Sequence, residues 1–166
     1  MNLYIARHAE ALPLGGIITR DADRRLSPRG EEDATLMGKA LAQLDSNVDI
    51  IVTSPLVRAI ETGECIGKQL SDHPIMHVSE HLAPGFSNNA LFRDLLSLGG
   101  GSNVVAIGHQ PDMSDFVSFL IAGSQGASVA MSAGSIAKLV LEGSRPQAYL
   151  GWLLTPEAVR SLYVGM

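Results

Sequence analysis

The chain has 166 residues, of which 46% are hydrophobic and 17% are charged, and its formal net charge is −5. These values are typical of one globular domain with a buried core, and the negative charge argues against nucleic-acid binding, which needs a basic face. The single cysteine excludes an internal disulfide and a multi-cysteine metal site. Because no stretch has the length of a membrane span and the first apolar run is too short for a signal peptide, we expect a cytoplasmic protein with one domain over residues 1–166 and no membrane partner.

A buried strand and a polar loop open the chain. Leu3, Tyr4 and Ile5 form a short apolar run of strand-forming residues, which ends at Arg7 and His8. In an open α/β sheet, ligands bind beyond the carboxyl ends of the strands, so this strand would carry both side chains to the binding edge. Taken alone, an Arg-His pair fits the start of a surface loop more simply, and the rest of the chain has to decide between the two interpretations.

Two helices and a second strand follow the loop over residues 11–25. Ser27-Pro28 is a helix start, with serine as N-cap and proline as first helical residue. Apolar residues at helical spacing give this helix one buried face: Ala34, Met37, Leu41 and Leu44. Residues 49–53 form the second predicted strand. Ser54-Pro55 repeats the cap signal and begins a helix that ends near Leu70.

The second half of the chain continues this alternation. The sequence predicts a strand over 74–79, a helix over about 89–98 that ends at glycines 99–101, a strand over 103–108 and a helix that contains Met113 and Val117. Residues 135–141 and 148–154 form a closing antiparallel strand pair. Alternating strands and helices predict an α/β fold, a three-layer α/β/α sandwich with a mostly parallel central sheet and one antiparallel strand.

Three predicted strand ends carry side chains that suit an anion. Arg7 and His8 follow the first strand, Arg58 follows the second, and His109 follows the fourth. With Ser54 as N-cap, Arg58 lies one turn into its helix and leans back towards the same sheet edge. Arginine binds phosphate in a bidentate manner, helix N-termini favour anions, and each charge-assisted hydrogen bond contributes about 1.5–3 kcal/mol. The pattern therefore predicts a site for phosphate or another oxyanion, and phosphoryl transfer to water without a cofactor.

Four motifs in order resemble the histidine phosphatase superfamily, which includes the phosphoglycerate mutases and the SixA-type phosphohistidine phosphatases. The matching segments are Arg7-His8-Ala9, Arg24-Arg25-Leu26-Ser27-Pro28-Arg29-Gly30, Ser54-Pro55-Leu56-Val57-Arg58-Ala59-Ile60-Glu61-Thr62 and Gly108-His109-Gln110-Pro111. Their order and spacing hold along nearly the whole chain. The resemblance implies a phosphoglycerate mutase-like fold and a single histidine phosphatase domain.

The resemblance also implies a role for each matched residue. His8 is the nucleophile and is transiently phosphorylated, Arg7 and Arg58 hold the phosphoryl oxygens, and His109 stabilises the transition state. The chemistry of the residues agrees, because a neutral imidazole is a fair nucleophile near pH 7 and nearby guanidinium groups disfavour its protonated form. The protonation state of His109 stays open at this point.

The match with the family allows two registers at one position and departs from the family pattern at another. Arg24 is expected to add to the pocket, but a slip of one residue would place Arg25 there instead. Ala9 stands where the family has glycine, and its methyl group would narrow the approach to the nucleophile or change the backbone angle. Either effect bears on efficiency and leaves the role of His8 unchanged.

The substrate is predicted from the segment after the third strand. Phosphoester-cleaving members of the family place a carboxylic acid there, whereas this chain has Pro84 at the corresponding place and Glu80 as the nearest carboxylate. An acid matters less for phosphohistidine, whose nitrogen leaving group departs more easily. The region before the fourth strand is also too short for a large lid. We therefore expect a phosphatase acting on phosphohistidine of a partner protein, such as a phosphotransfer domain in signal transduction.

Two other functions stay open. The chain could be a phosphomonoesterase for small molecules such as sugar phosphates, with Glu80 as acid, or a phosphoprotein-binding module without turnover. The intact His8, Arg58 and His109 argue against the second of these.

His73, His77 and His81 recur every four residues, but the predicted strand there would separate the last two by roughly 13 Å, so no metal is implied.

Overall fold

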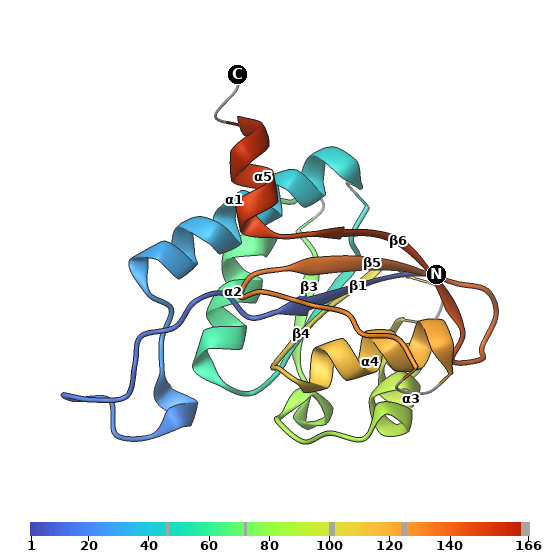
Figure 1. Ribbon diagram of the computed structural model, residues 1–166, viewed down its shortest axis with the longest axis horizontal. Coiled ribbons are helices and arrows are strands. Elements are labelled where there is room, and N and C mark those ends of the chain that lie inside the picture. Colours follow the sequence, from blue (N-terminus) through green and yellow to red (C-terminus); the bar gives the residue numbers. More distant parts are fainter. Residues whose placement is uncertain (46, 72, 100–101, 124–125, 164–166) are drawn as a thin grey trace.

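A six-stranded sheet forms the centre of the molecule. The computed structural model describes residues 1–166 except 46, 72, 100–101, 124–125 and 164–166. The strand order is β3-β2-β4-β1-β5-β6 (Figure 1). The strands are β1 (Asn2–Arg7), β2 (Ile50–Thr53), β3 (Ile75–Val78), β4 (Val104–Gly108), β5 (Ile136–Leu141) and β6 (Ala148–Leu154). All neighbouring pairs are parallel except those of β5, which runs antiparallel to both β1 and β6. The predicted fold class is thus confirmed.

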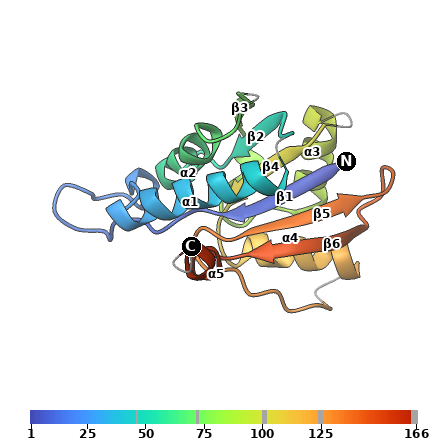
Figure 2. The ribbon, with the colours of Figure 1, turned by 90° about the horizontal axis from the view of Figure 1, so that it is seen from above.

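Helices cover both faces of the sheet (Figure 2). The helices are α1 (Pro28–Leu44), α2 (Val57–Gly67), α3 (Asn88–Gly99), α4 (Asp112–Ala122) and α5 (Pro156–Tyr163), with short 3₁₀ helices η1 (Asp21–Asp23) and η2 (Glu80–Leu82). Alternate residues of β1 enter different cores. Leu3 and Ile5 pack in the core that includes α3 and α4, whereas Tyr4 and Ala6 pack in the core that includes α1, α2 and α5. This alternation fixes the strand, and with it the position of the residues that follow.

The start of α1 is as predicted, whereas one residue of its predicted buried face is exposed. The Ser27 hydroxyl accepts a hydrogen bond from the Gly30 amide, and Pro28 is the first helical residue. Gly30 is required for packing, because a Cβ there would lie 2.0 Å from the Glu10 carbonyl oxygen. Leu44, predicted to be buried, is 54% exposed, and it is the residue at which the helix ends.

The second helix starts later than predicted. It begins at Val57, with Leu56 as an N-cap that makes no side-chain hydrogen bond, and it ends at Gly67. Ser54 is not the N-cap, because its hydroxyl contacts His109 and accepts a hydrogen bond from the Leu56 amide. Arg58 is therefore the second residue of α2 and still lies at the helix N-terminus. Helices α5, η1 and η2 were not predicted, and glycines 100–101 of the predicted helix end lie outside the described residues.

The structure bears on two further expectations. In the described part of the chain, no helix combines the length and the apolar character that a bilayer span needs. The described residues also hold no cluster of three or more histidine, cysteine or acidic side chains arranged to bind a metal ion. His77 lies on the exposed strand β3, and His73 and His81 flank that strand on either side.

Candidate active site

His8 and His109 follow neighbouring parallel strands and lie side by side. Arg7 pairs with Gly108 in the register of β1 and β4, and the His8 amide donates to the Gly108 carbonyl at 3.0 Å. The Gly134 amide donates to the His8 carbonyl at 3.1 Å and holds the chain from the other side. As a result, the two imidazole rings have centroids 5.0 Å apart and an interplanar angle of 53°. The sheet itself therefore sets the relative position of the two rings.

The hydrogen bonds of His8 define which ring nitrogen is free to react. Nδ1 lies 2.7 Å from the Ala9 carbonyl oxygen, which can only accept, so Nδ1 carries the hydrogen. Nε2 keeps its lone pair and accepts a hydrogen bond from Arg58 Nε at 3.2 Å. Burial lowers the pKa of His8 to about 4, and the charges of Arg58, Arg7 and Arg24 act in the same direction. His8 is therefore neutral near pH 7, with a nucleophilic Nε2.

Arg58 connects the nucleophile with the loop that precedes α1. Its side chain is buried, and its Nη1 and Nη2 donate to the Asp21 carbonyl oxygen at 2.8 Å and to the Asp21 carboxylate at 3.0 Å. The Thr62 hydroxyl donates to the Arg58 carbonyl at 2.7 Å and accepts from the Ala9 amide at 3.1 Å. This pair of bonds ties the first turns of α2 to the residue that follows His8.

Arg24 rather than Arg25 faces the site. Arg24 donates to the Leu12 carbonyl at 2.6 Å and to the Asp21 carboxylate at 3.1 Å, and its charge contributes to the lowered pKa of His8. The Arg25 side chain is 69% exposed and donates to the Glu61 carboxylate at 2.5 Å. The two arginines left open by the sequence therefore point to different partners, and only Arg24 adds charge to the pocket.

One ring nitrogen of His109 and one guanidinium nitrogen of Arg7 are buried without a hydrogen-bond partner among the described residues. His109 is 3% exposed, and its Nε2 lies 2.7 Å from the Ser54 hydroxyl. Arg7 donates from Nη1 to the Met131 carbonyl at 3.0 Å. His109 Nδ1 and Arg7 Nε are both buried and have no hydrogen-bond partner in the described part of the chain. An unsatisfied buried polar group costs about 1–3 kcal/mol, so these atoms indicate a ligand that is rich in oxygen.

The same surroundings keep His109 neutral. Burial lowers its pKa to about 3, and the nearby His8, Arg58 and Arg7 side chains act in the same direction. The sequence left this protonation state open. In the ligand-free protein both site histidines are therefore neutral, and the positive charge of the site resides on its arginines.

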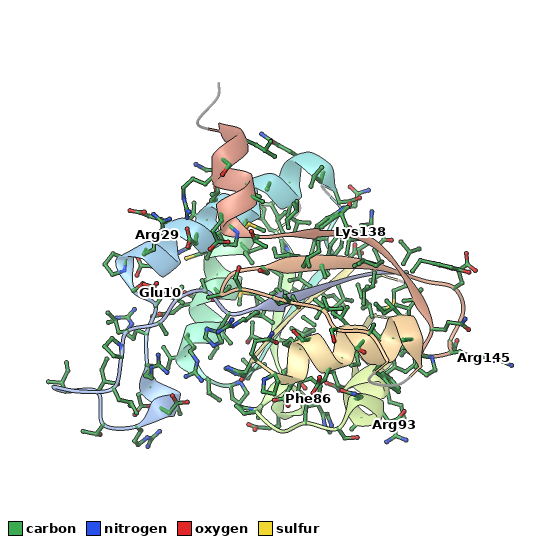
Figure 3. The ribbon with its side chains drawn as sticks, in the orientation of Figure 1. Glu10, Arg29, Phe86, Arg93, Lys138 and Arg145 are labelled. Carbon is green, nitrogen blue, oxygen red and sulfur yellow. The ribbon has the colours of Figure 1, made fainter. Side chains whose placement is uncertain are left out.

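Ala9 and Glu10 have structural roles beside the site. Ala9 is fully buried and packs with Leu26 and Ala34, and its backbone is not in the left-handed region that favours glycine. The methyl group thus lies in a small apolar cluster. Glu10 lies near the first turn of α1 (Figure 3) and accepts a hydrogen bond from the Ser27 hydroxyl at 2.6 Å.

The remaining carboxylates differ in their relation to the site. Glu80 is exposed on η2, and its side chain makes no hydrogen bond to another described residue. Asp21, which sequence reasoning did not single out, bridges Arg58 and Arg24, and these contacts hold its pKa below the usual value. Ser54 and Thr62 belong to the matched motif, but their contacts with His109 and Ala9 could not be predicted from spacing alone.

Comparisons with known proteins bear on the family and the fold of the chain. A model of the histidine phosphatase superfamily (branch 1) matches residues 3–83. An uncharacterized protein of Picosynechococcus sp. is 32% identical over 152 residues, which cover 90% of each chain. The structure of the protein histidine phosphatase SixA complexed with tungstate superposes with a TM-score of 0.84 at 25% identity, covering 94% of this chain and 97% of that one. A phosphoserine phosphatase from Entamoeba histolytica, in complex with phosphoserine, shares the fold with a TM-score of 0.68 at 15% identity, covering 95% and 98% of the two chains.

Proposed function

The chain belongs to the histidine phosphatase superfamily, and its likeness to the protein histidine phosphatase SixA supports a phosphatase, so we propose that it hydrolyses phosphohistidine on a partner protein through a phosphoryl group carried briefly by His8. One observation carries the proposal: the unprotonated Nε2 of His8 lies in a site with buried, unpartnered nitrogens on Arg7 and His109, among the residues that the structure describes. A nucleophile among such groups suits a tetrahedral anion that reacts at its centre.

In the first step, His8 Nε2 forms a bond to phosphorus. The bond from phosphorus to the substrate imidazole breaks, and its electron pair leaves with that imidazole. The Nδ1–H bond to the Ala9 carbonyl keeps the His8 ring oriented throughout and stabilises the positive charge that develops on it. Arg58 Nε, which donates to Nε2 in the free protein, turns to a phosphoryl oxygen when phosphorus takes that place.

In the second step, a water oxygen bonds to phosphorus and the bond to His8 Nε2 breaks. The electron pair returns to Nε2, one proton of the water passes to solvent, and inorganic phosphate leaves. Arg7 and Arg58 stabilise the charge spread over the phosphoryl oxygens in both transition states, and Arg24 adds positive charge that favours binding of the phosphoryl group. These three cations supply the charge that metal ions supply in other phosphatases, so we propose a metal-independent reaction.

The preference for phosphohistidine rests on the leaving group. An alkoxide needs a proton donor at the leaving oxygen, but Asp21, the carboxylate bound to the site's arginines, has its pKa lowered by them and is held ionised. The ring of phosphohistidine can instead be protonated by water at the nitrogen remote from phosphorus, and then it leaves as neutral imidazole. A site without a positioned acid therefore suits this substrate.

The proposed partner is a phosphotransfer domain that displays phosphohistidine on its surface in a cytoplasmic signalling relay. The similar SixA structure is that of a protein histidine phosphatase, which supports a protein substrate here. Between β3 and β4 the chain forms only η2 and α3 among its described elements. A short connection of this kind supports access for a protein surface.

The direct test is release of phosphate from a phosphorylated phosphotransfer domain. We expect the wild-type protein to release it, and the His8→Ala variant to be at least about 10³-fold slower, because the covalent route is lost. His77→Ala is the matched control, since His77 is an exposed histidine on the edge strand β3. Equal rates for wild type and His8→Ala would rule the proposal out.

A phosphomonoesterase for small molecules is the second candidate, and the shared fold of the phosphoserine phosphatase is the observation in its favour. It would require an acid, and Glu80 is the carboxylate to test. Under our proposal Glu80→Gln leaves phosphohistidine hydrolysis unchanged, because Glu80 is exposed and its side chain makes no hydrogen bond or ion pair with a described residue of the site. Rapid turnover of sugar phosphates or phosphoserine that is lost in Glu80→Gln would favour the second candidate.

A further inference from the structure

We infer that Ser54 is a positioning residue that keeps the ring hydrogen of His109 on Nδ1, so that His109 donates a hydrogen bond to the phosphoryl group. The inference rests on the proposed function, because it assigns a task within the same site. It starts from two facts about one buried ring: Nε2 lies 2.7 Å from the Ser54 hydroxyl, and Nδ1 has no partner in the described part of the chain.

The hydrogen on the Ser54 hydroxyl has one available acceptor among the described residues. Ser54 Oγ contacts the Leu56 amide at 3.3 Å and His109 Nε2 at 2.7 Å. An amide N–H can only donate, so the hydroxyl accepts from Leu56. Its own hydrogen is buried and has Nε2 as the one acceptor within hydrogen-bond distance among the described residues, so we assign that hydrogen to the bond with Nε2. Nε2 must then carry the lone pair. Because the surroundings keep His109 neutral, its one ring hydrogen lies on Nδ1.

The backbone around Ser54 makes this contact rigid. Ser54 is fully buried, and its amide donates to the Ile107 carbonyl at 2.9 Å. It therefore directly follows β2, beside the strand β4 that leads into His109. A hydroxyl fixed to one strand thus orients a ring fixed to the next.

The choice of tautomer decides what His109 can do. With the hydrogen on Nδ1, this buried nitrogen is a donor for an oxygen of the phosphoryl group, whose charge grows in the transition state. With the hydrogen on Nε2, the lone pair of Nδ1 would face that oxygen and repel it. Neutral imidazole in water favours the Nε2–H form, so the protein has to select the other one. Ser54 is the group that does so.

The experiment observes the tautomer directly. Long-range ¹H–¹⁵N NMR spectra of the whole protein, at pH 7 and without substrate, distinguish the protonated from the unprotonated ring nitrogen of His109. We expect Nδ1–H in the wild type and in Ser54→Thr, which keeps the hydroxyl, and Nε2–H or a mixture in Ser54→Ala. The matched control Ser79→Ala removes another buried serine, one that donates to Asp94, and should leave the His109 signals unchanged.

Kinetics complete the test. With a phosphorylated phosphotransfer domain, kcat should fall on the order of 10²-fold in Ser54→Ala with a small change in KM, and Ser54→Thr should restore most of it. A wild-type His109 with hydrogen on Nε2, or a Ser54→Ala variant that keeps Nδ1–H, would overturn the inference. Because the NMR measurement needs no substrate, it decides the role of Ser54 even if phosphohistidine proves to be the wrong substrate.

Discussion

The two halves of the site are held in different ways. His8 and His109 follow adjacent parallel strands, and backbone hydrogen bonds fix both the chain and one ring nitrogen. Asp21 and Arg24 belong to the loop before α1, where bonds from side chains to carbonyls hold them and Asp21 is 52% exposed. We propose that the sheet half sets the positions of the reacting atoms, whereas the loop half supplies charge for binding. Substitutions should therefore affect kcat in the first half and KM in the second.

Arg58 joins the two halves, so its loss should have the largest effect. Arg58→Ala removes the donor to His8 Nε2 and leaves Asp21 without two of its bonds. We expect kcat/KM for a phosphorylated phosphotransfer domain to fall by about 10³-fold, because several charge-assisted donors are lost at once. Arg93→Ala is the control, since Arg93 is exposed on α3 and lies well apart from Glu10, which follows shortly after His8 (Figure 3). A loss below tenfold would contradict the bridging role.

The two neighbouring arginines test the loop half alone. Arg24→Ala should raise KM by at least about tenfold with a smaller change in kcat, because one charge-assisted bond of about 1.5–3 kcal/mol is lost. Arg25→Ala should leave both constants unchanged, since Arg25 pairs with Glu61 outside the site. Steady-state kinetics of the two variants make the comparison. The reverse result, with Arg25 essential and Arg24 dispensable, would show that the loop adopts the other register.

The pH at which the His8 ring takes up a proton tests the sheet half. The pKa of His8 is lowered to about 4, so Nε2 keeps its lone pair until the pH falls through that value. In the unfolded chain a histidine has a pKa near 6.5, so the unfolded chain binds this proton more readily than the folded protein does. Between pH 4 and pH 6.5, His8 is therefore mostly neutral in the folded protein and mostly protonated in the unfolded chain. An NMR titration of the His8 ring should show a midpoint near pH 4. A midpoint near 6.5 would mean that the ring is solvated and only partly available as nucleophile at neutral pH.

The smallest expected effect on activity concerns Ala9. Ala9→Gly should change kcat and KM less than about twofold, because the methyl group packs with Leu26 and Ala34. Stability should fall by about 1–2 kcal/mol, from the lost buried methyl group and the greater freedom of glycine in the unfolded chain. Chemical denaturation together with kinetics separates the two effects. A large gain in activity would show that the methyl group obstructs the substrate.

The sheet half was the more predictable part of the molecule. Apolar runs that end in Arg7, His8 and His109 identify strands and the edge at which they stop, and the β1–β4 pairing places the rings together. The late start of α2 could not be predicted, because Ser54 has the sequence of a cap but its hydroxyl contacts a histidine far along the chain. A local pattern carries no information about such a long-range partner.

The loop half was only partly predictable for a related reason. The sequence shows a charged cluster over residues 20–25, but loops have no period that tells which side chains face inward. Arg24 and Arg25 are separated by their partners, Asp21 and Glu61, which lie on η1 and α2. The bridging role of Asp21 likewise depends on the packing of the loop against Arg58, which only the three-dimensional structure reveals.

Capture of the phosphorylated enzyme tests the central claim most directly. A phosphotransfer domain carrying radiolabelled phosphohistidine is mixed with the wild-type protein and quenched in base within milliseconds to seconds, and the label is mapped by peptide analysis. We predict transient label on His8, stable to base and labile to acid, and none on the His8→Ala variant. Release of phosphate by the wild-type protein with no label on His8 at any time, or with label on another residue, would contradict the proposed mechanism.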